Sequence, residues 1–181
     1  MRRLREFADA PISRPLAAEE VLELHAARLL LLFQHCGANG RMDGLTKMAK
    51  LDFFVRYPAF FAVAAAAEGQ EVAPKASEES SMVRYHYGPW DKRYYHLLAY
   101  LEALGLLSVE RRGNSFRMQL TLRGTEVANE LGGAPAFQRL VSHMREVKQV
   151  LGGKSGTRLK NLVYELFAKE VRGRALGEVI K

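Results

Sequence analysis

Basic side chains gather between residues 90 and 118, where they could bind a polyanion. Lysine and arginine pair with phosphates, so such a cluster predicts nucleic-acid binding that weakens as the salt concentration rises. The candidate DNA-binding residues lie in a predicted helix and a predicted hairpin: Lys92, Arg93, His96, Arg111, Arg112, Asn114 and Arg117. Two alternatives stay open, because charges on a hairpin are often only solvated and a basic surface also suits docking on a protein. The helix offers His96 and Tyr100 where base reading favours Asn, Gln or several Arg, so we expect contact with backbone phosphates rather than sequence recognition.

Aromatic residues precede and open the same predicted helix. They are interleaved with basic residues and comprise Tyr85, Tyr87, Trp90, Tyr94 and Tyr95. Exposed rings in this setting either stack on bases or form the hot spot of a protein interface. The alternative is packing at the entry to the helix, which we expect for Trp90 and Tyr94. Tyr85, Tyr87 and Tyr95 are therefore candidate partner-binding residues.

A second candidate partner-binding surface is an amphipathic segment near the C-terminus. Its apolar face is formed by Leu159, Leu162, Val163 and Leu166. A helix packs such a face on its own core or on a partner, and the pattern leaves both open. The preceding Gly152-Gly153-Lys154-Ser155 resembles the end of a phosphate-binding loop. That comparison fails, because Lys148 stands where the motif needs glycine and no strand is predicted before it.

Residues that could catalyse a reaction form no recognisable set. The five histidines show no metal-ligand spacing with carboxylates. The adjacent His35 and Cys36 diverge on a helix, which argues against a catalytic pair, and Cys36 is interpreted as a small core residue. Asp43 and Asp52 are interpreted as a helix cap and a surface residue. We therefore expect a binding protein rather than an enzyme, with no cofactor and no metal.

The elements that would position these residues are mainly helical with a small β-hairpin, an α+β fold. Periodicity and capping signals predict helices over 17–36, 43–57, 59–67, 91–104, 122–131, 136–151 and 157–171. Strands are predicted over 82–87, 106–111 and 115–120. Asp43, Asp91 and Thr121 are expected to cap helices. Gly88-Pro89 and Arg112-Gly113-Asn114 are expected to form turns.

The order helix, glycine, strand, basic turn, strand and helix from Asp91 to Leu131 predicts a winged-helix module. We divide the chain into an N-terminal arm (1–16), a winged-helix domain (17–133) with a polar loop (68–81), and a C-terminal helical extension (134–181). Winged helices that bind DNA place the third helix in the major groove and the wing beside the backbone. The same fold hosts other functions, so it does not settle the activity.

Bulk composition agrees with a folded binding protein. The chain has 181 residues, 48% of them hydrophobic, and a net charge of +7. The single cysteine excludes an intramolecular disulfide. No apolar stretch approaches a membrane span, and the basic N-terminus lacks the apolar region of a signal peptide. We expect a cytoplasmic protein that does not contact membranes.

Three segments of the chain resemble a known family. They are Asp43–Phe53 followed by Arg56-Tyr57-Pro58, then Met82–Asp91 followed by Arg93-Tyr94-Tyr95, and finally Leu159–Glu165. Together they resemble the small middle component of bacterial three-component ATPase systems, of which Lamassu-type anti-phage defence is the best-known example. The resemblance extends over about Leu22–Glu178 and contains no catalytic signature.

The resemblance implies an accessory subunit without chemistry of its own. It would bridge an ATPase subunit similar to SMC and Rad50 proteins, an effector nuclease subunit and double-stranded DNA. One alternative is a free-standing winged-helix transcription regulator, which would usually dimerise on palindromic half-sites. Another is a pure interaction protein, such as an antitoxin-like partner.

Overall fold

The computed structural model describes residues 21–73, 82–85 and 88–167. Five sequence expectations lie wholly or partly outside these residues: the arm 1–16, the helix start at 17–20, the loop segment 74–81, the strand end at 86–87 and the helix end at 168–171. Within the described residues the fold is mainly helical with a small three-stranded antiparallel sheet, so the α+β class is confirmed. No helix among them is long and apolar enough to cross a membrane.

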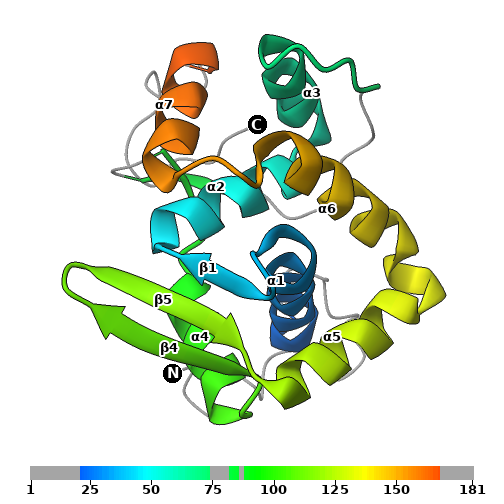
Figure 1. Cartoon of the computed structure of the whole chain (residues 1–181), viewed down its shortest axis with the longest axis vertical. Helices are drawn as coiled ribbons and strands as arrows, with labels where there is room; N and C mark the ends of the chain where they lie inside the picture. The colour runs from blue at the N-terminus through cyan, green and yellow to red at the C-terminus, as the bar shows by residue number, and fades with distance from the viewer. Residues whose placement is uncertain (1–20, 74–81, 86–87, 168–181) are drawn as a thin grey trace, which may run out of the picture.

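The helix α1 (Leu22–Cys36) lies in the middle of the molecule (Figure 1). Its residues 29–33 are at most 1% exposed, which explains why apolar residues cover so much of its circumference. It contacts four other helices: α2 (Leu45–Arg56), α4 (Tyr94–Ala103), α5 (Leu122–Gly133) and α6 (Gln138–Leu151).

The C-terminal helices share this core. A short 3-10 turn, η3 (Pro135–Phe137), leads into α6, which packs on α1, while α7 (Gly156–Leu166) packs on α2 and on α3 (Pro58–Ala67). Apolar residues of both α6 and α7 belong to the same buried cluster as those of α1. The expected helical extension is therefore packed on the body of the molecule, with α3 and α7 together at one end (Figure 1).

The three-stranded sheet has the order β1-β5-β4. The strands are β1 (Arg41–Asp43), β4 (Leu107–Arg112) and β5 (Ser115–Leu120). The hairpin β4–β5 matches the prediction closely, but β1 was not predicted. The run Gly37–Gly40 does more than end α1. It reverses the chain, with Asn39 and Gly40 at positive φ, so that the next three residues pair with β5.

The strand β1 overturns one capping prediction. Asp43 is not the cap of α2, because it belongs to β1 and pairs with Arg117 in the neighbouring strand. Gly44, at φ 91°, stands at the N-cap position without a capping side chain. In contrast, the Thr121 cap of α5 is confirmed, since its hydroxyl accepts the Gly124 N–H at 2.9 Å.

Two further boundaries differ from the sequence prediction. The expected Gly88-Pro89 turn is wrong, because β3 (Gly88–Trp90) pairs with β2 (Val83–Tyr85) as a separate two-stranded hairpin. The helix expected from Asp91 begins only at Tyr94. The Asp91 carboxylate still accepts the backbone N–H of Arg93, at 2.9 Å, in the turn that precedes the helix.

Candidate functional site

The β4–β5 hairpin carries its charges on two opposite faces. Side chains alternate along a strand, and directly paired residues of antiparallel strands share a face. The inner face, which continues into the core, carries Leu107, Val109 and Arg111 opposite Leu120, Met118 and Phe116. The outer face carries Glu110 and Arg112 of β4, Arg117 of β5, and Arg41 and Asp43 of β1. The predicted arginines are thus divided, with Arg111 on the inner face and the other two on the outer face.

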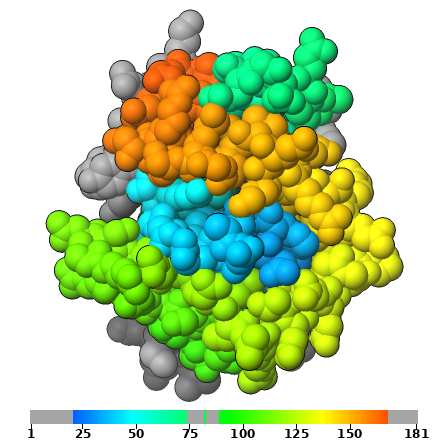
Figure 2. Space-filling view, viewed as in Figure 1, coloured from blue at the N-terminus to red at the C-terminus, as the bar shows by residue number. Residues whose placement is uncertain are grey.

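The outer face is a solvent-exposed network of ion pairs. Arg117 Nε lies 3.0 Å and Arg41 Nε 3.3 Å from carboxylate oxygens of Asp43. Arg112 Nε lies 3.0 Å from Glu110. Three arginines face two carboxylates, and the hairpin projects from the body of the molecule (Figure 2). Arg41 was missed by the sequence analysis, although the alternation of Arg41, Met42 and Asp43 is the period of a strand.

The residues predicted at the start of α4 have different surroundings. Lys92 and His96 are exposed, as a binding surface requires, and Asn114 is exposed in the hairpin turn. Arg93 turns inward instead. Its guanidinium binds both carboxylate oxygens of Asp91, at 2.7 and 2.9 Å, and also contacts His25 of α1. Arg93 therefore does not present a free cation beside Lys92 and His96.

Arg93 belongs to a buried charge network that joins α1, α2 and the start of α4. Asp52, interpreted from sequence as a surface residue, is 0% exposed, so that interpretation is wrong. Its carboxylate accepts hydrogen bonds from Arg28 Nε at 3.0 Å and from the Tyr94 hydroxyl at 2.6 Å. Arg56 of α2 lies 3.6 Å from Asp52 and 2.8 Å from Asp91. Two carboxylates thus connect guanidinium groups from three parts of the chain.

The network holds its groups in defined ionisation states. Burial disfavours the charged form of Asp91 and by itself would raise the pKa. Hydrogen bonds from the Arg93 side chain and backbone, together with the charge of Arg56, outweigh burial and keep the pKa of Asp91 well below its usual range. Burial, followed by the charge of Asp52, raises the pKa of Tyr94 well above its usual value. Tyr94 therefore stays protonated and donates to Asp52, which ties the first residue of α4 to α2.

An apolar notch lies between α4, the inner face of the hairpin and the start of α2. We call it the α4–hairpin notch; its volume is about 160 Å³, and it is lined by Leu45, Tyr95, Leu98, Ala99, Glu102, Val109 and Phe116. Leu98, at 5% exposed, is the most deeply buried α4 residue of this set, whereas Tyr95 is 61% exposed. Of these residues, only Tyr95 was a predicted binding residue, because the others come together only when positions from 45 to 116 meet in the fold.

The other aromatic candidates are only partly described. Tyr94 is fully buried and stacks edge-on with Trp90 at 5.1 Å between ring centroids, so the expected packing of these two rings is confirmed. The Tyr95 ring lies 5.9 Å from that of Trp90 and keeps most of its surface in solvent. Tyr85 is in β2, and Tyr87 lies outside the described residues.

The candidate partner-binding face of α7 is mostly inside the protein. Leu159, Leu162 and Val163 are at most 2% exposed and Leu166 is half-buried, so these side chains pack on the chain's own core. Of the two possibilities left open by the sequence, the structure therefore favours the core over a partner surface. The reason is that α2 and α3 supply the apolar counterpart within the same chain.

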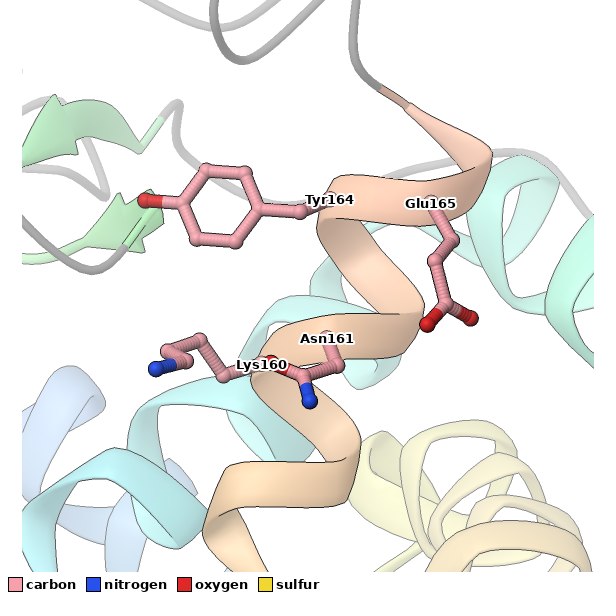
Figure 3. Close-up of a pocket in the computed structure, with 4 residues that line it drawn as sticks. All are labelled: Lys160, Asn161, Tyr164 and Glu165. Carbon is pink, nitrogen blue, oxygen red and sulfur yellow. The ribbon is translucent and has the colours of Figure 1, made fainter.

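The solvent-facing side of α7 borders a polar hollow of about 510 Å³. Among the described residues, Lys160, Asn161, Tyr164 and Glu165 line it. Lys160 and Tyr164 extend from α7 toward the β2–β3 hairpin (Figure 3). Nearby, Lys50 is 1% exposed and donates to the Pro89 carbonyl at 2.9 Å. Burial, assisted by the charge of Lys160, lowers the pKa of Lys50 to about 7.

The structure gives Lys154 and Cys36, the other residues considered for phosphate binding or catalysis, surroundings that do not favour those roles. Lys154, in the segment that resembles a phosphate-binding loop, lies 2.7 Å from the Glu68 carboxylate, and α6 rather than a strand precedes it. Burial raises the pKa of Cys36 to about 12, so its thiol is not poised to react. Among the described residues, no three His, Cys, Asp or Glu side chains gather as a metal site.

Comparison with known proteins adds no relative from which a role could be transferred. No protein-family model matches the chain, and neither a curated protein nor a solved structure matches it.

Proposed function

We propose that this chain is a winged-helix accessory subunit that binds a protein partner and DNA and catalyses no reaction itself. The observation that carries the proposal is the sheet order β1-β5-β4 combined with the element order α1, β1, α2, α4, β4, β5. In a winged helix the first strand pairs with the last, and the third helix leads directly into the wing. On this interpretation α4 is the third helix, β4–β5 is the wing, and α3 with β2–β3 is an insertion.

The proposed partners follow from the family resemblance. The subunit would act beside an SMC- or Rad50-like ATPase and an effector nuclease in bacterial defence against phages and plasmids. Its exposed helices α3, α5 and α6 offer surface for such contacts, and the outer face of the hairpin offers cations for DNA. An exposed arginine can exchange its carboxylate partner for a phosphate at little energetic cost.

The surface of α4 weighs against a free-standing transcription regulator. Base-specific readout uses Arg, Lys, Asn or Gln on the helix that enters the major groove. The exposed positions of α4 are instead Tyr95, His96, Ala99, Glu102 and Ala103, which include a carboxylate that would repel phosphate. DNA contact through this chain would therefore be contact with the backbone, made by the hairpin.

The test is co-expression with an SMC-like ATPase encoded beside it. We expect the two proteins to co-purify and the complex to retain double-stranded DNA at low salt. Arg112→Glu with Arg117→Glu should weaken DNA retention without weakening ATPase binding. Arg158→Glu, at an exposed arginine of α7 that is also paired with carboxylates, is the control. A lone chain that forms a dimer with strong sequence preference would overturn the proposal.

A further inference from the structure

We propose that Arg41 and Arg117 form a binding site for one phosphate group of the DNA backbone, and that the Asp43 carboxylate occupies this site as an internal competitor until DNA displaces it. This inference rests on the proposed function, because it takes DNA to be a ligand of the outer face of the hairpin. It goes further by assigning a phosphate site to two named side chains and by naming the group that limits its affinity.

The strand register brings the three side chains together. Asp43 lies directly opposite Arg117 in the pairing of β1 with β5, and Arg41 lies two residues before Asp43 on the same face. The backbone N–H of Gly44 donates to the Phe116 carbonyl at 2.8 Å, which continues this contact past the end of β1. The sheet backbone therefore fixes where the Asp43 carboxylate stands relative to the two guanidinium groups.

One carboxylate engages both arginines. Oδ1 of Asp43 lies 3.0 Å from Nε of Arg117, and Oδ2 of Asp43 lies 3.3 Å from Nε of Arg41. Each oxygen thus takes a different guanidinium group. A phosphate group of the DNA backbone likewise has two unesterified oxygens that share one negative charge, and guanidinium groups suit both kinds of oxyanion. The geometry of the cluster therefore shows that Arg41 and Arg117 can hold one oxyanion jointly.

The site is open to a ligand from solution. The side chains of Arg41, Asp43 and Arg117 are 44%, 53% and 33% exposed. Ion pairs this exposed add little stability, because water and salt compete for both partners. Asp43 belongs to the same chain, however, so it competes with a single free anion at a high effective concentration. DNA overcomes this advantage by contacting several cations at once, including Arg112 on the same face.

The rest of the outer face favours a polyanion over a protein segment. Protein interfaces usually place aromatic or other apolar anchors at their centre. The remaining side chains of the outer face are all polar or charged and comprise Ser108, Glu110, Arg112, Ser115 and Gln119. The face therefore offers hydrogen bonds and charges to a phosphate backbone but no apolar contact to a protein anchor.

The test measures binding of the whole chain to a labelled duplex of mixed sequence by fluorescence anisotropy at graded salt. Asp43→Asn keeps the shape of the side chain and removes its charge. Glu110→Gln is the matched control, because it removes one charge from the same face but from a carboxylate paired with one arginine, Arg112. We expect Asp43→Asn to tighten DNA binding about threefold to tenfold, and Glu110→Gln to tighten it by at most about twofold.

A double-mutant cycle identifies the arginine through which Asp43 acts. Arg41→Gln should remove most of the gain that Asp43→Asn gives, because it takes away one of the two arginines of the site. In the Asp43→Asn protein it should also lower the slope of log K against log salt by about one unit. Inorganic phosphate, added at constant ionic strength, should leave the duplex bound. Displacement of the duplex by inorganic phosphate would assign the site to free phosphate and overturn the inference.

Three further results would count against it. Equal gains from Asp43→Asn and Glu110→Gln would mean that net charge alone acts, and a gain that survives Arg41→Gln would exclude the shared site. Weaker binding by Asp43→Asn would make this carboxylate a positioning group rather than a competitor. If circular dichroism shows that Asp43→Asn does not fold, Asp43→Ala must give the gain instead.

Failure of this inference can be told apart from failure of the proposed function. A duplex that binds the wild type, with any of the contrary results above, refutes the internal competitor and leaves the DNA contact standing. A duplex that binds neither the wild type, nor Asp43→Asn, nor the complex with the ATPase at low salt refutes the DNA contact itself, and the phosphate site with it. Co-purification with the ATPase reports the protein partner independently of both.

Discussion

Two arginine–aspartate pairs with the same separation lie in opposite environments of this molecule. Arg28 Nε and Asp52 Oδ1 are 3.0 Å apart in the interior, and their side chains are 2% and 0% exposed. Arg117 Nε and Asp43 Oδ1 are also 3.0 Å apart, but on the hairpin, where their side chains are 33% and 53% exposed. Water and salt screen the hairpin pair and compete for both partners, whereas neither reaches the buried pair.

The difference assigns separate roles to the two sets of charges. A buried charge that loses its partner has no water to replace it, so the interior network joins α1, α2 and the start of α4 in one geometry. An exposed pair can open and offer its arginine to an anionic ligand. Although the two distances are equal, the Arg28–Asp52 pair has a structural role, whereas the Arg117–Asp43 pair can open and bind an anionic ligand.

The largest effect should come from removing one buried carboxylate. Asp52→Ala leaves Arg28 and Arg56 without this partner in a dry site, which we expect to cost about 3–5 kcal/mol of unfolding free energy. Asp43→Ala, its exposed counterpart, should cost about 0–1 kcal/mol. Urea denaturation followed by circular dichroism measures both. Similar losses for the two variants would show that the interior pair is not a distinct structural element.

The second prediction concerns acid. Hydrogen bonds and arginine charges lower the pKa of folded Asp91, so the folded state favours the ionised carboxylate. This stabilisation is complete above the ordinary carboxyl pKa of about 4 and is lost as the pH falls below it. We expect a loss on the order of 2 kcal/mol between about pH 4 and pH 2 that Asp91→Asn does not show. A parallel fall in both proteins would exclude Asp91 as its source.

Lys50 shows the reverse relation between folding and charge, because it is a buried cation without a carboxylate partner among its described contacts and folding disfavours its charged form. Its pKa is about 7 in the folded state, while an unfolded lysine titrates near about 10.4. The unfolded state therefore binds more protons between these values, and stability should rise with pH across this interval. Lys50→Met should abolish the rise and stabilise the protein at pH 7 by about 1–3 kcal/mol, since it also loses the hydrogen bond to Pro89. Lys92→Met, an exposed control, should change neither quantity.

Elements defined by local sequence signals could be predicted, whereas elements that depend on pairing with distant segments could not. The segment from α4 to α5 carries its own local signals: the apolar stripe beginning at Tyr94, the Arg112-Gly113-Asn114 turn and the Thr121 cap. The strand β1 carries only a weak local signal, because three residues show a single alternation and its pairing with β5 joins positions more than seventy residues apart. The strand predicted over 82–87 contains β2, but β3 was missed because Gly88-Pro89 is a common turn sequence, yet it forms part of an edge strand here.

The sequence predicted which residue types belong to the candidate site, but not how their side chains are arranged in space. The sequence identified the hairpin arginines but not their division between two faces, which depends on strand register. It misplaced Asp52 because its partner Arg28 lies on α1 and meets it only after folding. It misplaced Arg93 because the sequence does not show that Asp91, two residues away, and His25 of α1 both draw its guanidinium inward. The α4–hairpin notch likewise needs α2, α4 and the hairpin in place before it exists.

The smallest stability effect is expected on the hairpin, where substitutions on its two faces can be compared by their effect on DNA binding. Arg112→Gln and Arg117→Gln should each change the unfolding free energy by less than about 0.5 kcal/mol. Each should nevertheless reduce the salt dependence of DNA binding by the complex, by about one unit in the slope of log K against log salt. Arg111→Gln should leave that slope unchanged, because its side chain lies on the inner face of the hairpin. If all three substitutions reduce the DNA slope equally, the hairpin tip acts as one basic patch, and the separation of its two faces has no functional consequence.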